Sequence, residues 1–147
     1  MPRLAAAFCS SAALALVCSS LSAQRILATV RGTGQGDGLG EVVAALGDLD
    51  GDSIADFAVC AQPASSQATP YLELRSGQDA HLLRTIAGVG GEEWGVSVAG
   101  IGDVNADGTP DLVVGIPNRI NAASRGAMEI YSGRDGARIA TVIEPTE

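Results

Sequence analysis

Short apolar runs separated by polar turns fill the sequence from residue 39 onward. Each run is five to seven residues long, is rich in Val, Ile, Leu and Ala, and is bounded by Gly, Asp or Ser. No long stretch with the 3.6-residue period of a helix lies between the runs, so the pattern predicts an all-β fold. The predicted strands are Glu41–Gly47, Ala55–Ala61, Tyr71–Ser76, Leu82–Ile86, Val96–Gly102, Asp111–Ile116, Ala127–Ser132 and Arg138–Ile143.

The predicted strands form two copies of one unit. The stretch that begins at Leu39 matches the stretch that begins at Trp94 at an offset of 55 residues, and the offset becomes 56 after one inserted residue. Four strands in a repeat of about 50 residues are typical of a β-propeller blade. The offset of 56 also aligns Leu27–Val30 with Leu83–Ile86. We therefore expect one extra N-terminal strand, the outer strand of a preceding blade.

The first residues have the features of a secretory signal peptide. Arg3 gives a positive start, an apolar stretch follows from Leu4 to Val17, and small residues surround Ala23. The stretch is shorter than the roughly 20 residues of a membrane span, and no later segment is as apolar. Cys18 lacks the small preceding residues that a lipid anchor would favour. We expect cleavage after Ala23, no membrane span, and a secreted mature chain, extracellular or periplasmic.

Two repeats are few for a propeller. Closed propellers have typically about four to eight blades, and an isolated pair would leave sheet faces and edges uncovered. We therefore expect further blades from a longer protein or self-association of this chain, in preference to an open pair. The expected domains are the signal peptide at 1–23, the strand of a preceding blade with a Gly-rich connector at 24–38, the first repeat at 39–93 and the second repeat at 94–147.

The mature chain is acidic, and its acids are concentrated. Once Arg3 is removed, 17 acidic residues stand against 8 arginines, and there is no lysine. Scattered arginines without a basic stripe argue against a nucleic-acid partner. Seven of the carboxylates lie in two loops, Gly47–Asp56 and Gly102–Asp111. This concentration indicates bound cations more than a solvated acidic tail.

The two loops carry oxygen ligands at alternate positions. Calcium prefers six to eight oxygen ligands, and neither loop contains the His or Cys that zinc or copper would favour. We therefore predict two Ca²⁺ sites and no other cofactor. The predicted ligands are Asp48, Asp50, Asp52, the carbonyl of Ile54 and Asp56 in the first loop, and Asp103, Asn105, Asp107, the carbonyl of Thr109 and Asp111 in the second.

An EF-hand loop begins with the same spacing but needs an acid at position twelve and a helix after it. Position twelve is Val59 in one loop and Val114 in the other, each inside an apolar run, so the loops are predicted to join two strands. The alternative that these residues simply make good turns leaves close like charges uncompensated. Gly108 suits the sharp turn at position six, whereas the first loop has Ser53 there, so we expect the second site to be better formed.

Markers on both sides of the loops resemble the FG-GAP repeats of the integrin alpha-chain N-terminal propeller and of secreted bacterial proteins. Trp94-Gly95 and Gly115–Pro117 stand for the two markers in the second repeat. Leu39-Gly40 is a weaker match in the first, and Cys60–Gln62 lacks the Gly and the Pro. The resemblance implies calcium-bound propeller blades, with the loop ligands named above.

Cys60 is the only cysteine that remains after removal of the signal peptide, so no internal disulfide is expected. We expect it to be a small buried residue of a strand, with an intermolecular disulfide as the alternative. Candidate catalytic groups are weak. His81 has no convincing partner in the sequence, and Glu92 and Glu93 are adjacent, so in a strand they would point to opposite faces. We expect Trp94 to pack between blades.

No catalytic set emerges, and we expect the chain not to be an enzyme. The favoured function is extracellular binding or adhesion, in which calcium stiffens loops that present side chains to an unidentified protein or glycan. Two alternatives remain open: a non-catalytic accessory part or remnant of a secreted hydrolase or lyase acting on polysaccharide or phosphoester, and a purely structural repeat spacer of a surface protein. The fold alone does not decide among them.

Overall fold

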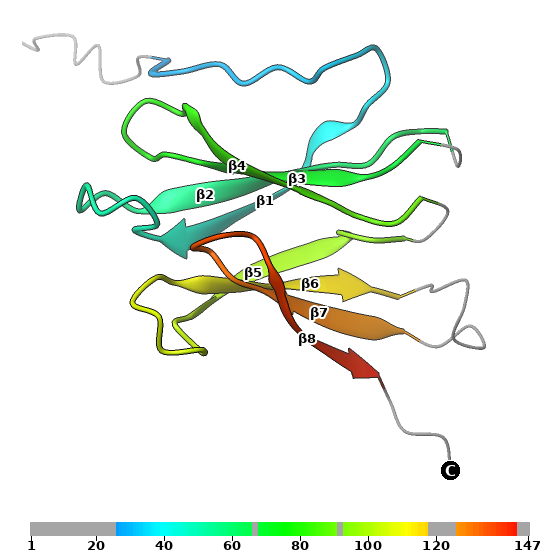
Figure 1. The fold of residues 1–147 in the computed structure, drawn as a ribbon. Helices are drawn as coiled ribbons and strands as arrows, with labels where there is room; N and C mark the ends of the chain where they lie inside the picture. Colours follow the sequence, from blue (N-terminus) through cyan, green and yellow to red (C-terminus); the bar gives the residue numbers. More distant parts are fainter. Residues whose placement is uncertain (1–25, 66–67, 91–92, 118–125, 144–147) are drawn as a thin grey trace, which may run out of the picture.

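The chain forms two four-stranded antiparallel sheets in a computed structural model that describes residues 26–65, 68–90, 93–117 and 126–143 (Figure 1). Each sheet is a meander in which every strand pairs with the next one along the chain. Sheet 1 contains β1 (Leu39–Gly47), β2 (Asp56–Ala61), β3 (Tyr71–Arg75) and β4 (Leu82–Ala87). Sheet 2 contains β5 (Ser97–Gly102), β6 (Asp111–Ile116), β7 (Ala127–Tyr131) and β8 (Arg138–Ile143).

The predicted all-β class, the two repeated units and all eight strands are confirmed, with bounds that differ by at most two residues. The arrangement is consistent with two propeller blades, and the described residues do not close into a ring. Among them there is no helix with the length and apolar character that a membrane crossing requires. The predicted signal peptide lies outside the described residues, as does Glu92.

The expected ninth strand is not formed. Residues 26–32 have no regular secondary structure, and they run along the outer side of sheet 1 (Figure 1). A strand needs a neighbour for its backbone hydrogen bonds, and sheet 1 already has a fourth strand of its own in β4. Leu27–Val30 therefore resembles β4 in sequence but has no sheet to join among the described residues.

The two sheets pack face to face, and the core lies between them. Trp94 is fully buried there, so its predicted place between blades is confirmed. The predicted burial of Cys60 in a strand is also confirmed, and burial raises the pKa of its thiol to about 11. The other core residues are Ala58, Leu72, Leu74 and Ile86 from sheet 1, and Leu112, Val114, Ile116, Ala127 and Tyr131 from sheet 2.

Both Asp-rich loops lie at the same end of the molecule (Figure 1). One loop joins β1 to β2 and the other joins β5 to β6, as predicted. The antiparallel order also brings the β3–β4 and β7–β8 turns to this end. The loops of the two sheets are neighbours, because a Cβ added at Gly47 would lie 2.9 Å from Cγ of Pro110. The candidate site is therefore built on four connections at one rim.

Candidate metal site

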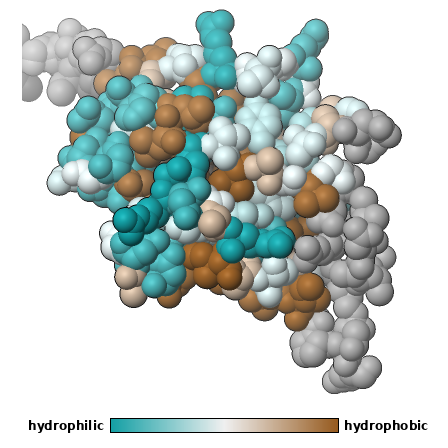
Figure 2. All heavy atoms as spheres, in the orientation of Figure 1, coloured by the Kyte–Doolittle hydropathy of each residue, from teal (hydrophilic) through white to brown (hydrophobic). Residues whose placement is uncertain are grey.

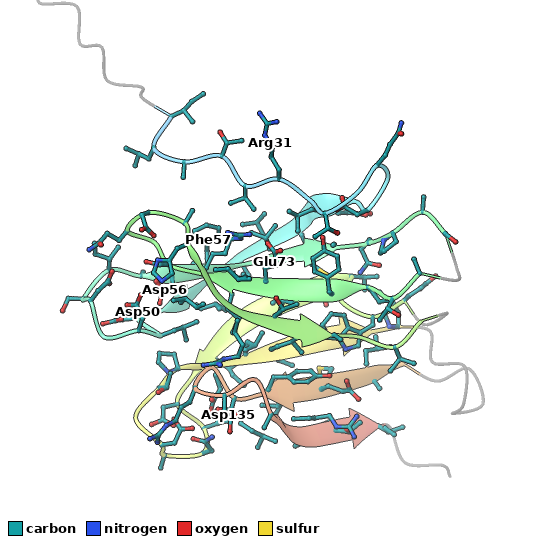
Figure 3. All side chains as sticks on the ribbon, turned by 45° about the horizontal axis from the view of Figure 1, so that its top comes forward. Arg31, Asp50, Asp56, Phe57, Glu73 and Asp135 are labelled. Carbon is teal, nitrogen blue, oxygen red and sulfur yellow. The ribbon has the colours of Figure 1, made fainter. Side chains whose placement is uncertain are left out.

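Three acidic side chains of the first loop converge. Asp48, Asp50 and Asp56 each place a carboxylate oxygen within 4.8 Å of the others. Asp48 is half-buried, Asp50 is exposed and Asp56 is buried, so the cluster leads from solvent into the sheet. Figure 3 shows Asp50 and Asp56 near one another at the loop end of sheet 1. Their approach in a metal-free description is electrostatically unfavourable, and a cation would remove that repulsion.

Backbone N–H groups surround the Asp48 carboxylate. Its Oδ1 accepts hydrogen bonds from Gly51 at 2.6 Å and Asp52 at 3.2 Å, and its Oδ2 accepts one from Ser53 at 2.8 Å. These bonds lower the pKa of Asp48, and the bond from Ser53 has the largest effect on it. Asp48 is thus held as a carboxylate in a fixed orientation, which is the state that a metal ligand requires.

Asp52 is not part of the three-acid cluster. Its Oδ1 accepts a hydrogen bond from the backbone N–H of Ile54 at 2.7 Å, which makes a local turn. The carboxylate is thereby turned toward its own backbone. Of the four acids predicted to bind calcium in the first loop, the structure brings three together and leaves Asp52 aside.

Asp56 links the loop to the rest of sheet 1. It is 1% exposed, and its Oδ2 accepts a hydrogen bond from Leu49 at 2.6 Å. Its Oδ1 accepts one from Gly77, in the β3–β4 turn, at 2.8 Å. The side chain therefore has a structural function besides any contact with a metal.

Asp111 repeats this arrangement in the second loop. It is fully buried, and its Oδ2 accepts a hydrogen bond from Val104 at 2.9 Å. Its Oδ1 accepts one from Gly133, in the β7–β8 turn, at 3.2 Å. Both repeats thus use the ninth loop position to connect the Asp-rich loop to the neighbouring turn.

The rest of the second loop follows the first. Asp103 accepts hydrogen bonds from the backbone of Asp107 at 3.0 Å and Gly108 at 2.8 Å. Asp107 also accepts bonds from the Asn105 side chain and from Thr109, both at 2.9 Å. The Asn105 amide is the main reason that the pKa of Asp107 is lowered.

The two loops differ in their acid content. Asn105 stands where the first loop has Asp50, so the second loop has one carboxylate fewer. Within the described part of the chain, the Asp48 group is the only cluster of three or more acids, histidines or cysteines close enough to share an ion. The amide oxygen of Asn105 remains a suitable ligand, but it accepts a hydrogen bond from the backbone of Asp107 at 2.9 Å.

Backbone strain is shared between the loops, contrary to our expectation. Ser53 does adopt a positive φ, of 69°, and Gly108 takes 90° at the same position. Two positions earlier, however, the first loop has Gly51 at 85° and the second has Ala106 at 60°. At these two positions each loop therefore has one glycine and one non-glycine residue with a positive φ. The predicted conformational advantage of the second loop is wrong.

The donors of the first cluster fit a hard dication. Three carboxylates at this separation can each give an oxygen, and the exposed position of Asp50 leaves access for water ligands. Asp48, Asp50 and Asp56 are the side chains that would hold the ion. Calcium suits a flexible oxygen site of this kind better than magnesium, which requires near-octahedral geometry. When bound, the ion would offset two of the three negative charges of the cluster and join the two ends of the loop.

Comparison with known proteins locates a family signature in sheet 2. Residues 94–127 match the FG-GAP repeat. This stretch is similar to an FG-GAP repeat. It contains the Asp103–Asp111 loop between two paired strands, β5 and β6. Asp-rich clusters like that of the first loop are typical of FG-GAP calcium sites.

The chain is also distantly similar to mouse (Mus musculus) Integrin alpha-E, with 28% identity over 120 residues. The alignment covers 73% of this chain and 10% of the integrin, so the chain spans about a tenth of that relative. FG-GAP and integrin-like repeats are generally non-catalytic.

The first marker of the FG-GAP repeat has a packing function here. Trp94 fills the space between the sheets, and its ring meets Tyr131 edge to face with centroids 6.0 Å apart. Gly95 has a φ of 86°, and a Cβ at this position would lie 2.5 Å from Sγ of Cys60 in sheet 1. The pair therefore allows the second sheet to approach the first.

Of the candidate catalytic groups, His81 and Glu93 lie in the part of the chain that the structure describes. His81 does have a partner, because its Nδ1 lies 2.6 Å from Oδ1 of Asp79, and this contact raises the pKa of His81. Both side chains are exposed on the β3–β4 turn, and Asp79, but not His81, lines a cavity beside sheet 1. Glu93 is exposed at the start of the second repeat.

Sequence reasoning missed the contribution of the short turns to the site. Gly77 and Gly133 donate to the ninth-position acids, and the Ser132 hydroxyl donates to Asp107 at 3.3 Å. The signal was present, because Ser76-Gly77 and Ser132-Gly133 occupy equivalent positions in the two repeats. Their hydrogen-bond partners are far away in sequence and could not be assigned from spacing.

Proposed function

We propose that this chain is a secreted, calcium-binding FG-GAP module that binds an extracellular protein or glycan and is not an enzyme. The observation that carries the metal part is the Asp48, Asp50 and Asp56 cluster in a strand-joining loop. The FG-GAP repeat and the similarity to Integrin alpha-E support the same reading.

Calcium would act at both loops through the same mechanism. The acids at the first position are oriented by backbone N–H groups, and those at the ninth position are fixed to the neighbouring turn. The ion would therefore bind to a frame that is largely formed already. Its binding would stiffen the rim where the loops of both sheets meet.

A rigid rim is suited to recognition. Binding surfaces are commonly formed by loops held on a sheet scaffold, and ordering such loops in advance lowers the entropy lost on binding. Exposed side chains of the β1–β2 and β5–β6 loops, including Asp50, Ile54 and Val104, are available there. Export through the predicted signal peptide would place this rim in a compartment where millimolar calcium is available.

The proposal can be tested with the purified chain on an immobilised panel of extracellular-matrix proteins and glycans. We expect binding to at least one component in calcium, with loss of binding in chelator and in Asp48→Asn. Asp135→Asn is the matched control, because Asp135 is an exposed acid on the β7–β8 turn outside both loops. Binding that is equal in calcium and chelator would contradict the calcium-dependent mechanism, and absence of any binding would contradict the recognition function.

A further inference from the structure

The geometry points to head-to-tail association of copies of this chain, in which the outer face of sheet 2 of one copy packs on the outer face of sheet 1 of the next. The proposal rests on the internal repeat and does not depend on the metal sites. It assigns the occupant of both outer faces as a second copy.

The interface inside one copy supplies the template. Sheet 1 presents one of its faces to sheet 2, and the residues of that face include Cys60, Leu72 and Ile86, which are paired side by side across β2, β3 and β4. The face of sheet 2 that packs against it includes Val114 and Glu129, which are paired across β6 and β7. We call the first kind of face the X face and the second kind the Y face.

The repeat offset puts the same two kinds of face on the outside. Residues 55 or 56 positions after the X face of sheet 1 are Gly115, Met128 and Val142, which are paired with one another across the outer face of sheet 2. In the same way, Val59 and Glu73 on the outer face of sheet 1 correspond to the Y face of sheet 2. An outer X face therefore lies on sheet 2 and an outer Y face on sheet 1, where Val59 and Glu73 are only 6% and 5% exposed.

Exposure differs sharply between equivalent positions of the two X faces. Leu72 is fully buried where sheet 2 covers it, whereas its equivalent Met128 is 49% exposed. Ile86 is 5% exposed and its equivalent Val142 is 48% exposed. Among the described residues, these apolar positions are thus covered in the first repeat and exposed in the second. Figure 2 shows apolar side chains in brown on the lower side of the molecule, where sheet 2 lies.

The free X face of sheet 2 is also shaped to receive a surface. A groove of about 570 Å³ opens on it, lined by Val96, Pro117, Met128, Val142 and Ile143 among others. No charged side chain lines this groove. Burial of this groove would therefore remove apolar area from water without burying an unpaired charged group.

The outer Y face of sheet 1 matches this requirement. Its buried acid, Glu73, already forms an ion pair with Arg75 at 2.7 Å, so covering the face leaves Glu73 paired. Phe57 and Glu73 lie on the side of sheet 1 toward the N-terminal segment that carries Arg31 (Figure 3). Leu27 and Val30 from this segment line a cavity of about 430 Å³ against the sheet. An incoming sheet would have to displace this segment, in which Leu27 is 77% exposed.

The symmetry of this contact is heterologous, because unlike faces meet. An isologous dimer would instead join two X faces or two Y faces. An X-to-Y contact can be repeated from copy to copy until the accumulated rotation closes a ring. Because each copy contributes two sheets, a closed assembly would contain an even number of sheets.

A cysteine pair distinguishes the head-to-tail contact from other modes. Within one copy, Cδ of Arg84 would lie 2.7 Å from a Cβ at Gly136. The repeat offset of 56 relates Arg84 of sheet 1 to Ala140 of sheet 2, and it relates Gly136 of sheet 2 to Ala80 of sheet 1. Ala140 and Ala80 should therefore meet where two copies join. Chains with Ala80→Cys and chains with Ala140→Cys, mixed under mild oxidation, should form disulfide-linked dimers of one chain of each kind.

The matched controls are each variant alone, which should give little cross-linked product, and the unmodified chain, whose Cys60 is buried. Cross-linking of Ala140→Cys chains to one another at the yield of the mixture would overturn the head-to-tail arrangement. Absence of cross-linking in the mixture would overturn it as well.

Mass in solution gives the second test. Light scattering of the purified chain over increasing concentration should show association, which Met128→Asp should weaken at least tenfold. Val89→Asp is the control, because Val89 is equally exposed, at 47%, but lies in the β4–β5 connection. Circular dichroism confirms that each variant is folded. A folded wild-type chain that remains monomeric, or association that Met128→Asp leaves unchanged, would overturn the proposal.

Discussion

The carboxylate of Asp56 accepts a hydrogen bond from the backbone N–H of Gly77, 2.8 Å away and 21 residues later in the chain. This contact ties the Asp-rich loop of sheet 1 to the β3–β4 turn. Sheet 2 has the same contact between Asp111 and Gly133. The ninth-position acid is therefore part of the frame of each sheet as well as a predicted calcium ligand.

The first prediction separates these two functions. Asp111→Ala removes a buried acceptor from two backbone donors, so it should lower the free energy of unfolding by about 2 to 3 kcal/mol even in chelator. Urea unfolding with and without calcium measures this difference. Asp103→Ala is the control, because Asp103 is exposed and should affect stability mainly when calcium is present. Equal stability of Asp111→Ala and wild type in chelator would show that the frame does not depend on this side chain.

The second prediction concerns the ligand sets. Asp50→Ala should abolish calcium binding at the first loop, whereas Asp52→Ala should weaken it less, because Asp52 lies outside the converging acids. Asp107→Ala should remove the second site, since Asp107 also holds the Asn105 side chain in place. Isothermal titration calorimetry gives the number of sites in each variant. Two intact sites in Asp50→Ala or Asp107→Ala would refute the ligand assignment.

The third prediction uses the strained positions of the two loops. Ser53 and Ala106 each hold a positive φ that is unfavourable for a residue with a side chain. Ser53→Gly and Ala106→Gly remove this strain, and each should raise the free energy of unfolding by about 1 kcal/mol. Gly51→Ala and Gly108→Ala are the reciprocal variants and should lower it by a similar amount. Thermal unfolding in chelator measures the four values free of metal effects. A change of the same sign in all four would be inconsistent with the backbone conformations described.

Much of the fold could be predicted from the sequence, because its signals are local. Alternating apolar runs and Gly or Asp turns define strands without knowledge of distant residues, and the offset between Leu39 and Trp94 defines the repeat. The prediction of a strand at Leu27–Val30 was wrong because strand formation there depends on a non-local partner. Its sequence favours a strand, but a strand forms only beside a partner, and the described residues offer none.

The candidate site was predictable in its residues but not in its contacts. Alternating acids in a short loop were sufficient to nominate Asp48, Asp50 and Asp56. Nothing in the sequence shows that Asp52 turns toward its own backbone or that Ala106 has a positive φ, because alanine gives no signal of a left-handed conformation. The link from Asp56 to Gly77 depends on the sheet having formed.

The fourth prediction concerns the buried acid between the sheets. Glu129 accepts hydrogen bonds from the Tyr131 hydroxyl at 2.6 Å, from Arg138 at 2.7 Å and from Nε1 of Trp94 at 3.3 Å. Burial disfavours its charge, but these bonds outweigh that effect and lower the pKa of Glu129 below its ordinary 4.5. Burial also raises the pKa of Tyr131 to about 12, so the phenol remains a donor.

A lowered carboxyl pKa in the folded state stabilises the protein above the unfolded pKa, and that stability is lost as the pH falls through the folded value. Wild type should therefore lose stability below about pH 4.5, and Glu129→Gln should lose less over the same range. Trp94 is the only tryptophan and reports unfolding by fluorescence. The difference between the two proteins, measured in chelator, isolates Glu129 from the loop acids. Parallel pH profiles would contradict this assignment.

Calcium-dependent stabilisation of the two sheets is the central claim, and thermal unfolding of the purified chain in calcium and in chelator tests it most directly. For a dissociation constant near 10⁻⁴ M, about 10 mM calcium should stabilise the fold by roughly 2.7 kcal/mol per site. The midpoint should rise by about 10 °C or more, with no comparable rise in magnesium. Asp135→Asn should retain the full shift, and the double variant of Asp50→Ala and Asp107→Ala should lose it. A midpoint that is the same in calcium and in chelator would contradict the account.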